Sequence, residues 1–260
     1  MTLLSDTGYL FVRYLKKLVR NPILLFFSLF QPIIFLLLFT QLFSRFSSLQ
    51  GFAGATGGAS SYLEFATAGI LLQNAFGSAL QSGTSIVLDL DTGYLQKMLV
   101  TPVSRYAILL GRLTSDAFRV VVQSAIIIAL AYALGATVVT GVGGILLMLF
   151  TVAFFGLAWS GISLAIGLKT RSSETVFAIG GFLTFPLLFM STALTPKLFM
   201  PNWILNVSNF NPISYTVDAA RVLMINGYDW ATVLKAFGVI GLIAVVTLGA
   251  TLYLFRKVVS

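Results

Sequence analysis

Long apolar stretches separated by short polar ones dominate this chain. Six intervals contain about 20 or more mainly apolar residues, the length that a helix needs to cross a bilayer. These intervals are residues 23–43, 62–88, 108–134, 142–168, 175–194 and 230–255. The pattern predicts an all-α polytopic membrane protein with six transmembrane helices and a cytoplasmic tail at 256–260.

Basic residues between the apolar stretches indicate the orientation, because cytoplasmic loops carry an excess of Lys and Arg. With the N-terminus inside, eleven basic residues fall on the cytoplasmic side and four on the outer side. This distribution predicts a multi-pass protein with both termini in the cytoplasm. We expect the membrane to be the plasma (inner) membrane of a bacterium or archaeon.

Composition supports this class and excludes several kinds of chemistry. The 260 residues are 58% hydrophobic and 9% charged, whereas soluble proteins average about 25% charged residues. The absence of Cys and His excludes disulfides, thiolate catalysis and His-ligated metals. No phosphate loop or serine-hydrolase motif is found. We expect no catalytic residue, metal or cofactor in this chain, and no nucleic-acid partner, since topology accounts for its basic residues.

Residues 1–22 precede the first apolar stretch and predict an amphipathic helix in the cytoplasmic interface. Over Asp6–Arg20, side chains such as Tyr9 and Leu10 can face membrane lipid while Arg13 and its neighbouring lysines face headgroups. A solvated basic leader that only enforces topology is the alternative. Asn21-Pro22 then breaks the helix.

The polar interval Asp89–Arg112 interrupts the apolar pattern and is expected in water at the membrane surface. Within it, Gly93–Val100 predicts a short amphipathic helix, followed by a Thr101-Pro102 turn. One side of that helix carries Leu95, Met98 and Leu99. This side can press into a groove of a cytosolic protein and transmit its movement to the adjoining spans. A loop helix packed on its own bundle is an equally good interpretation.

Residues 195–229 are too apolar for a free loop and too rich in proline for a spanning helix. They predict short helices in the outer leaflet, with Trp203 and Tyr215 suited to the headgroup layer. The spacing of Asp218 and Arg221 predicts an ion pair on one helix.

Polar residues also occur inside the expected spans. Gln73, Gly77 and Gln81 share one face of the second span, beside Asn74. This face can line a translocation path, or its amides can bond across packed helices. Asp116 and Arg119 are spaced to pair within the third span, where extension toward the interface is the preferred interpretation.

Three motifs in register resemble ABC-2 type transporter permeases, the family that includes daunorubicin-resistance and nodulation-type exporters. The first, DTGYLQKMLVTPVSR over Asp91–Arg105, is similar to the family pattern E-x-G-T-L-E-x-L-L-V-T-P-V-S-R. The second is Arg20-Asn21-Pro22 with Gln31-Pro32. The third combines residues of the outer segment, namely Pro201, Trp203, Asn211, Pro212, Tyr215, Asp218 and Arg221. Together the motifs follow the family's order across nearly the whole chain.

The resemblance implies the permease subunit of an ATP-binding cassette exporter. Two copies of the chain, or one copy with a close homologue, would join two copies of a cytosolic ATPase that binds ATP and Mg. The residues that would couple to it are Asp91, Gly93, Tyr94, Leu95, Met98, Leu99, Thr101, Pro102 and Arg105. Asp91, Tyr94 and Gln96 depart from the Glu, Thr and carboxylate common at these positions, which removes a carboxylate from the expected contact.

The cargo that the resemblance implies is a hydrophobic or amphipathic compound, such as a drug, antibiotic or lipid-like molecule. Export of a polysaccharide or lipid-linked glycan is the alternative within the family. An ion-coupled secondary transporter is the alternative from another class. It would need carboxylates near mid-membrane, whereas the carboxylates here fall in loops or near span ends.

Overall fold

The computed structural model describes residues 3–48 and 50–259, which contain helices and no strand. The all-α prediction is therefore confirmed. The longer helices are α1 (Leu3–Val19), α2 (Pro22–Leu42), α4 (Tyr62–Asp91), α6 (Arg105–Ala133), α7 (Gly141–Thr170), α8 (Ser173–Phe189), α10 (Pro212–Ile225) and α11 (Trp230–Val259). The shorter elements are α3 (Phe52–Thr56), α5 (Tyr94–Leu99), α9 (Asn202–Ser208) and two 3-10 turns, Ser44–Ser48 and Lys197–Phe199.

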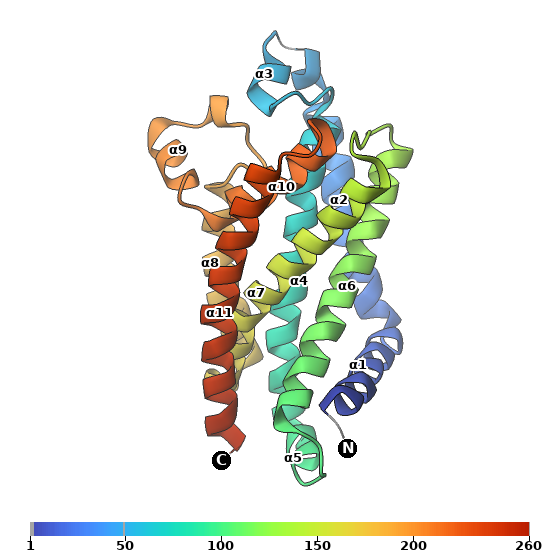
Figure 1. Ribbon diagram of the computed structural model, residues 1–260, viewed down its shortest axis with the longest axis vertical. Helices are drawn as coiled ribbons and strands as arrows, with labels where there is room; N and C mark the ends of the chain where they lie inside the picture. The colour runs from blue at the N-terminus through green and yellow to red at the C-terminus, as the bar shows by residue number, and fades with distance from the viewer. Residues whose placement is uncertain (1–2, 49, 260) are drawn as a thin grey trace.

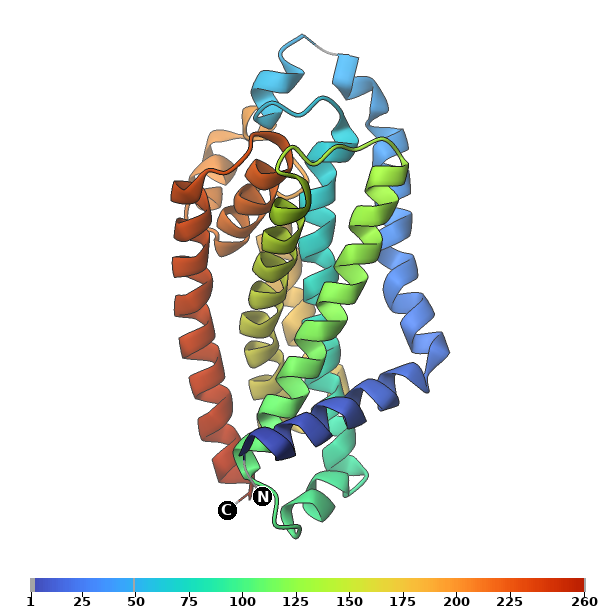
Figure 2. The ribbon, with the colours of Figure 1, turned by 45° about the vertical axis from the view of Figure 1, so that its right-hand side comes forward.

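The long helices form an elongated bundle with α4 near its centre (Figure 1). The two ends of the chain lie at the same end of this bundle as α5, which we call the α5 end. Helix α1 runs across the bundle near the α5 end and meets α2 at a sharp corner (Figure 2). Helices α3 and α9 lie toward the opposite end, here called the α3 end.

Within the described residues, four helices are long and apolar enough to cross a membrane: α2, α6, α7 and α11. Helix α4 is long enough to cross a membrane but falls outside this set, since amide and hydroxyl side chains interrupt its apolar run. Most of its surface contacts protein, so these polar groups need not face lipid. The 17 residues of α8 extend about 25 Å, less than the roughly 30 Å of a bilayer core. The six-span topology stays a prediction.

Helix α8 ends at Phe189, five residues before the expected end of the fifth span. Pro186 lies in its last turn and cannot donate a backbone hydrogen bond. The side-chain amide of Asn211 donates to the carbonyls of Leu187 and Met190, at 2.6 and 3.2 Å. These bonds satisfy carbonyls at the end of α8 and attach the start of α10 to it.

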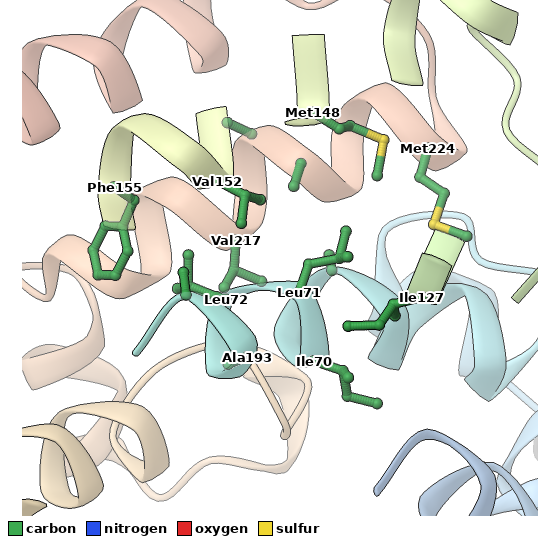
Figure 3. Packing of buried hydrophobic residues seen from close by; sticks show 14 of the residues in the cluster. Ile70, Leu71, Leu72, Ile127, Met148, Val152, Phe155, Ala193, Val217 and Met224 are labelled. Atoms are coloured by element: carbon green, nitrogen blue, oxygen red, sulfur yellow. The ribbon is translucent and has the colours of Figure 1, made fainter. Parts of the chain in front are cut away.

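Apolar residues of α4 fill the centre of the bundle and contact three other helices. Figure 3 shows this packing, in which α4 side chains meet residues of α6, α7 and α10. The residues at the contact are Ile70, Leu71, Leu72, Ile127, Val152, Phe155 and Val217. Burial of these side chains fixes α4 as the element around which the other helices are placed.

Glycines bring α4 and α7 close together. A Cβ added to Gly83 would lie 2.5 Å from the carbonyl oxygen of Ser163, and one added to Gly167 would lie 2.7 Å from that of Gly83. Neither position can hold a larger residue without a shift of the backbone. A Cβ added to Gly161 would likewise lie 2.6 Å from Oγ1 of Thr247 on α11. Small residues thus let these helices pack closely, as is typical of membrane helix interfaces.

Candidate functional site

A cavity of about 540 Å³ lies between α2, α4, α6 and α8. Its mouth is formed by Phe27 of α2 with Phe177 and Phe185 of α8, each of which is more than half exposed. Leu80 and Leu188 add apolar surface. The volume falls in the range of about 300–1,000 Å³ that is typical of small-molecule sites. We call this space the central cavity.

Amide side chains make part of this lining polar. They are Gln31, Gln73, Asn74, Gln81 and Gln123. Asn74 donates to the hydroxyl of Ser124 at 3.3 Å, and Gln123 donates to that of Ser28 at 2.8 Å. These bonds connect α4 with α6 and α6 with α2. A compound in the central cavity would meet both aromatic rings and amide groups.

The α4 face that the sequence marked as a translocation path borders the central cavity. Gln73, Gly77 and Gln81 all line it, and a Cβ added to Gly77 would meet nothing within 4 Å. Gln73 Oε1 and Thr184 Oγ1 are buried and have no hydrogen-bond partner among the described residues. Such acceptors can be satisfied by a ligand or by water. A different face of α4, which includes Gly83, makes the close packing.

A second cavity of about 360 Å³ adjoins the first where α1 meets α2. We call it the basic pocket because Lys17, Arg112 and Arg119 line it. Gln81 and Thr84 of α4 line both cavities, as does Leu24 of α2. The two spaces therefore adjoin, and Gln81 lines both of them.

An ion-pair cluster around Asp89 lies beside the basic pocket. Lys17 Nζ is 2.8 Å from Asp89 Oδ1, and Arg112 pairs with the other carboxylate oxygen. The Tyr14 ring packs against Arg112, whose guanidinium carbon is 4.7 Å from the ring centroid. This Asp89 triad joins α1, α4 and α6. No local sequence pattern predicts it, because Lys17 and Arg112 are 72 and 23 residues from Asp89.

Asp116 and Arg119 form the ion pair that their spacing predicted, at 3.4 Å. The expected extension of Arg119 toward the interface is wrong, because this side chain is only 6% exposed. It bonds instead to Ser78 and Gln81 of α4, with its Nε 2.9 Å from the Ser78 hydroxyl. Partners on the neighbouring helix make burial of this cation tolerable.

Helix α5 lies at the end of the bundle where the chain begins and ends (Figure 1). Gly93 precedes it with a φ of +67°, which glycine adopts without strain. The helix spans Tyr94–Leu99, one residue shorter at each end than expected. Its apolar side chains face inward: Leu95 is 1% exposed and Met98 is 6% exposed. Of the two interpretations of this helix, this burial favours a loop helix packed on its own bundle over one that presses Leu95 and Met98 into a groove of another protein.

Polar and small residues make up the exposed surface of this region. Tyr94, Gly93 and Leu99 are half-buried. The exposed residues are Asp91, Gln96, Lys97, Val100, Thr101, Pro102 and Arg105. A cytosolic partner would meet this side of α5 and the turn that follows it.

Helix α1 holds α5 from one side. The Arg13 guanidinium lies 3.6 Å from the centroid of the Tyr94 ring, and its Nη1 is 3.3 Å from Met98 Sδ. The Ser104 backbone N–H donates to the Asp6 carboxylate at 3.4 Å. A displacement of α5 would therefore act directly on α1, and through the corner at Asn21 on α2.

The expected short helices of the outer segment are present as α9 and α10. Pro201 precedes α9, and Trp203 on this helix is 62% exposed. Pro212 begins α10 after the cap at Asn211. The Tyr215 hydroxyl donates to the Asn209 carbonyl at 2.6 Å and so closes the turn between the two helices.

The ion pair predicted between Asp218 and Arg221 is present at 3.2 Å, and Lys197 completes an Asp218 triad at 3.1 Å. Arg221 also donates to the Thr192 carbonyl at 2.7 Å and lies 3.9 Å from the Phe65 ring centroid. Burial lowers the pKa of Arg221 to about 10, against the opposing effect of Asp218. The group stays cationic at neutral pH and attaches α10 to α4.

Comparison with known proteins gives one family. Residues 6–225 match the family described as ABC-2 type transporter. The chain is 34% identical over 242 residues to a protein of Cyanophora paradoxa named as transport permease ycf38, covering 84% of this chain and 77% of that protein. It is 31% identical over 203 residues to the daunorubicin resistance ABC transporter permease protein DrrB1 of Streptomyces coeruleorubidus, covering 78% and 69%.

A more distant relative is named as a multidrug ABC transporter permease, YbhR of Escherichia coli. It is 24% identical over 189 residues, which cover 72% of this chain and 50% of that protein. The family match includes α5, the amide face of α4 and most of the outer segment. This chain belongs to the ABC-2 type transporter family and is a multi-pass membrane permease.

Proposed function

We propose that this chain exports a hydrophobic or amphipathic compound with energy from ATP hydrolysed by a separate subunit. The central cavity is the observation that carries the proposal. It combines exposed aromatic rings at its mouth with amide groups on α4, so it can accept a molecule that is mainly apolar and has a few polar groups. The drug-resistance relative DrrB1 supports this cargo class.

Coupling to the ATPase is assigned to the exposed side of α5. Two permease chains and two ATPase subunits would form the working exporter, with ATP and Mg held by the ATPase. Movement of α5 would pass to α1 through Arg13 and Tyr94, and from α1 to α2 at the edge of the central cavity. The α5 end and both termini would then lie in the cytoplasm, as the excess of basic residues predicts.

Transport can be tested in inside-out vesicles that contain the permease together with its ATPase subunit. A panel of fluorescent amphiphiles with anionic, neutral and cationic heads would be added with ATP. We expect ATP-dependent accumulation of at least one of them, lost when the permease is omitted. If none accumulates although the ATPase is bound and active, export of this cargo class is wrong.

Val100→Asp tests the coupling surface without disturbing the core, because Val100 is 86% exposed. Leu95→Asp would be a poor probe, since Leu95 is buried and a charge there would unfold α5. We expect Val100→Asp to weaken co-purification of the ATPase and ATP-driven transport. Val139→Asp is the matched control, because Val139 is 62% exposed in the loop between α6 and α7. Equal results for the two variants would contradict the coupling role.

Orientation can be measured separately, because the sequence has no Cys and single introduced cysteines are unambiguous. A maleimide that cannot cross membranes should label Gln50→Cys, near α3, in intact cells. It should label Ser172→Cys, between α7 and α8, only after the cells are opened. The reverse pattern would place the α5 end outside.

A further inference from the structure

The basic pocket carries an excess of positive charge, and two of its cations, Arg112 and Arg119, are buried. Lys17, Arg112 and Arg119 are its cations, and the carboxylates that pair with them belong to Asp89 and Asp116. Three cations against two carboxylates leave a net charge of +1 on these five side chains. An uncompensated charge near the bilayer is costly, so a bound anion would stabilise this arrangement.

Unused hydrogen-bonding groups lie in the same pocket. Arg112 is 2% exposed, and its Nε has no hydrogen-bond partner among the described residues. Lys17 offers a mobile ammonium, since its side chain is 41% exposed although it contacts Asp89. Asp116 Oδ2 is an acceptor that likewise has no partner in the described part of the chain. The pocket thus offers donors to an anionic group and one acceptor to a neighbouring hydroxyl or amine.

The pocket continues into an apolar space. Gln81 receives a hydrogen bond from Arg119 and lines both cavities. Beyond it, the central cavity leads to Phe27, Phe177 and Phe185, which are exposed at the mouth between α2 and α8. A single molecule with a charged head and an apolar tail would fit the two adjoining cavities. Its head would lie at Arg112 in the basic pocket, and its tail would pass through the central cavity toward the bilayer.

We infer that the two cavities together bind an anionic amphiphile, whose phosphate or carboxylate head occupies the basic pocket. This inference rests on the proposed function and narrows its cargo class. The head is held by Lys17 and the free Nε of Arg112, and a hydroxyl or amine on the same head donates to Asp116. The tail lies between α2 and α8.

Binding of three detergents with the same twelve-carbon tail tests the inference. They are dodecyl phosphate, dodecyl maltoside and dodecyltrimethylammonium, titrated at neutral pH into the full chain in nanodiscs of a zwitterionic lipid. We expect dodecyl phosphate to bind more tightly than the other two. Inorganic phosphate alone is a further arm, and we expect it to compete weakly, because the tail contributes to binding.

Two variants should change the affinity in opposite directions. Lys17→Gln removes the accessible cation and keeps the buried Arg112–Asp89 pair, and we expect dodecyl phosphate to bind about three- to fivefold more weakly. Asp116→Asn removes a carboxylate from the pocket and should tighten binding of the phosphate head. Lys16→Gln is the matched control, because Lys16 is exposed on the same helix and does not line the basic pocket.

Equal affinity for the three detergents, or equal effects of Lys17→Gln and Lys16→Gln, would overturn the inference. It also falls if dodecyl phosphate does not bind while cysteines at position 177 cross-link two chains, because the mouth would then belong to a second copy. ATP-driven export of a neutral or cationic amphiphile that is unaffected by Lys17→Gln would leave the proposed function intact and contradict only this inference.

Discussion

Ion-pair clusters of the same composition lie beside the two ends of α4, in different surroundings. In the Asp89 triad, the carboxylate side chain is 3% exposed and pairs with Lys17 and Arg112. In the Asp218 triad, the carboxylate side chain is 26% exposed and pairs with Lys197 and Arg221. The first adjoins a pocket that shares lining residues with the central cavity. The second borders a space of about 240 Å³ that shares none with it.

This comparison separates a binding role from a structural one. The Nε of Arg221 and the Nε of Arg112 are both buried without a hydrogen-bond partner among the described residues. The other donors of Arg221 bond to the Thr192 carbonyl and to Asp218, and the space beside it shares no lining residue with the central cavity. Arg112 lines a pocket that shares Gln81 with the central cavity. Ion pairs alone therefore do not identify a site. The neighbouring cavity decides which cluster can meet a ligand.

Of three substitutions in the two clusters, Asp89→Asn is expected to lower the free energy of unfolding most. This change leaves Arg112 buried without its carboxylate, and loss of one partner of a buried pair typically costs about 3–5 kcal/mol. Thermal unfolding of the purified protein in detergent should show a large drop in melting temperature. A near-normal melting temperature would mean that solvent reaches Arg112 freely and that the Asp89 triad is not a buried cluster.

Asp218→Asn should lower the free energy of unfolding by less, about 1–3 kcal/mol, because Arg221 keeps its bond to the Thr192 carbonyl. The same unfolding measurement would rank the two variants. Dodecyl phosphate affinity should be unchanged in Asp218→Asn, since this cluster lies outside the basic pocket. Loss of affinity in this variant would break the distinction between the two ends.

Lys197→Gln should lower the free energy of unfolding least, by about 0–1 kcal/mol, as is usual for exposed ion pairs. The Lys197 side chain is 53% exposed and its pair with Asp218 is open to solvent. Its melting temperature should stay close to that of the unchanged protein at both low and high salt. A large salt-dependent drop would show that the Asp218 triad is more enclosed than its exposure indicates.

Local spacing predicted part of this picture. The apolar period along residues 62–88 predicted α4, and the three-residue spacing predicted the pairs Asp116–Arg119 and Asp218–Arg221. Leu95 and Met98 were placed correctly on one side of a helix, but periodicity does not say what that side contacts. The structure turns it toward the bundle.

Contacts between distant segments could not be predicted from one sequence. The Asp89 triad needs the corner at Asn21 to bring α1 across the ends of α4 and α6. Gln73, Gly77 and Gln81 were identified as one face, yet only the positions of α2 and α8 make that face the wall of a cavity. A basic residue in a leader such as Lys17 gives no sequence signal for a partner 72 residues away.

The central claim is that cargo occupies the central cavity beside Gly77. Gly77→Leu tests it most directly, because a Cβ at this position meets nothing within 4 Å and the larger side chain can enter the cavity without displacing the helix. Gly249→Leu is the control, since Gly249 on α11 is exposed and equally free of close neighbours. ATP-driven transport in inside-out vesicles should fall strongly in Gly77→Leu and stay normal in Gly249→Leu, at equal expression and ATPase binding. Normal transport by Gly77→Leu would contradict the account.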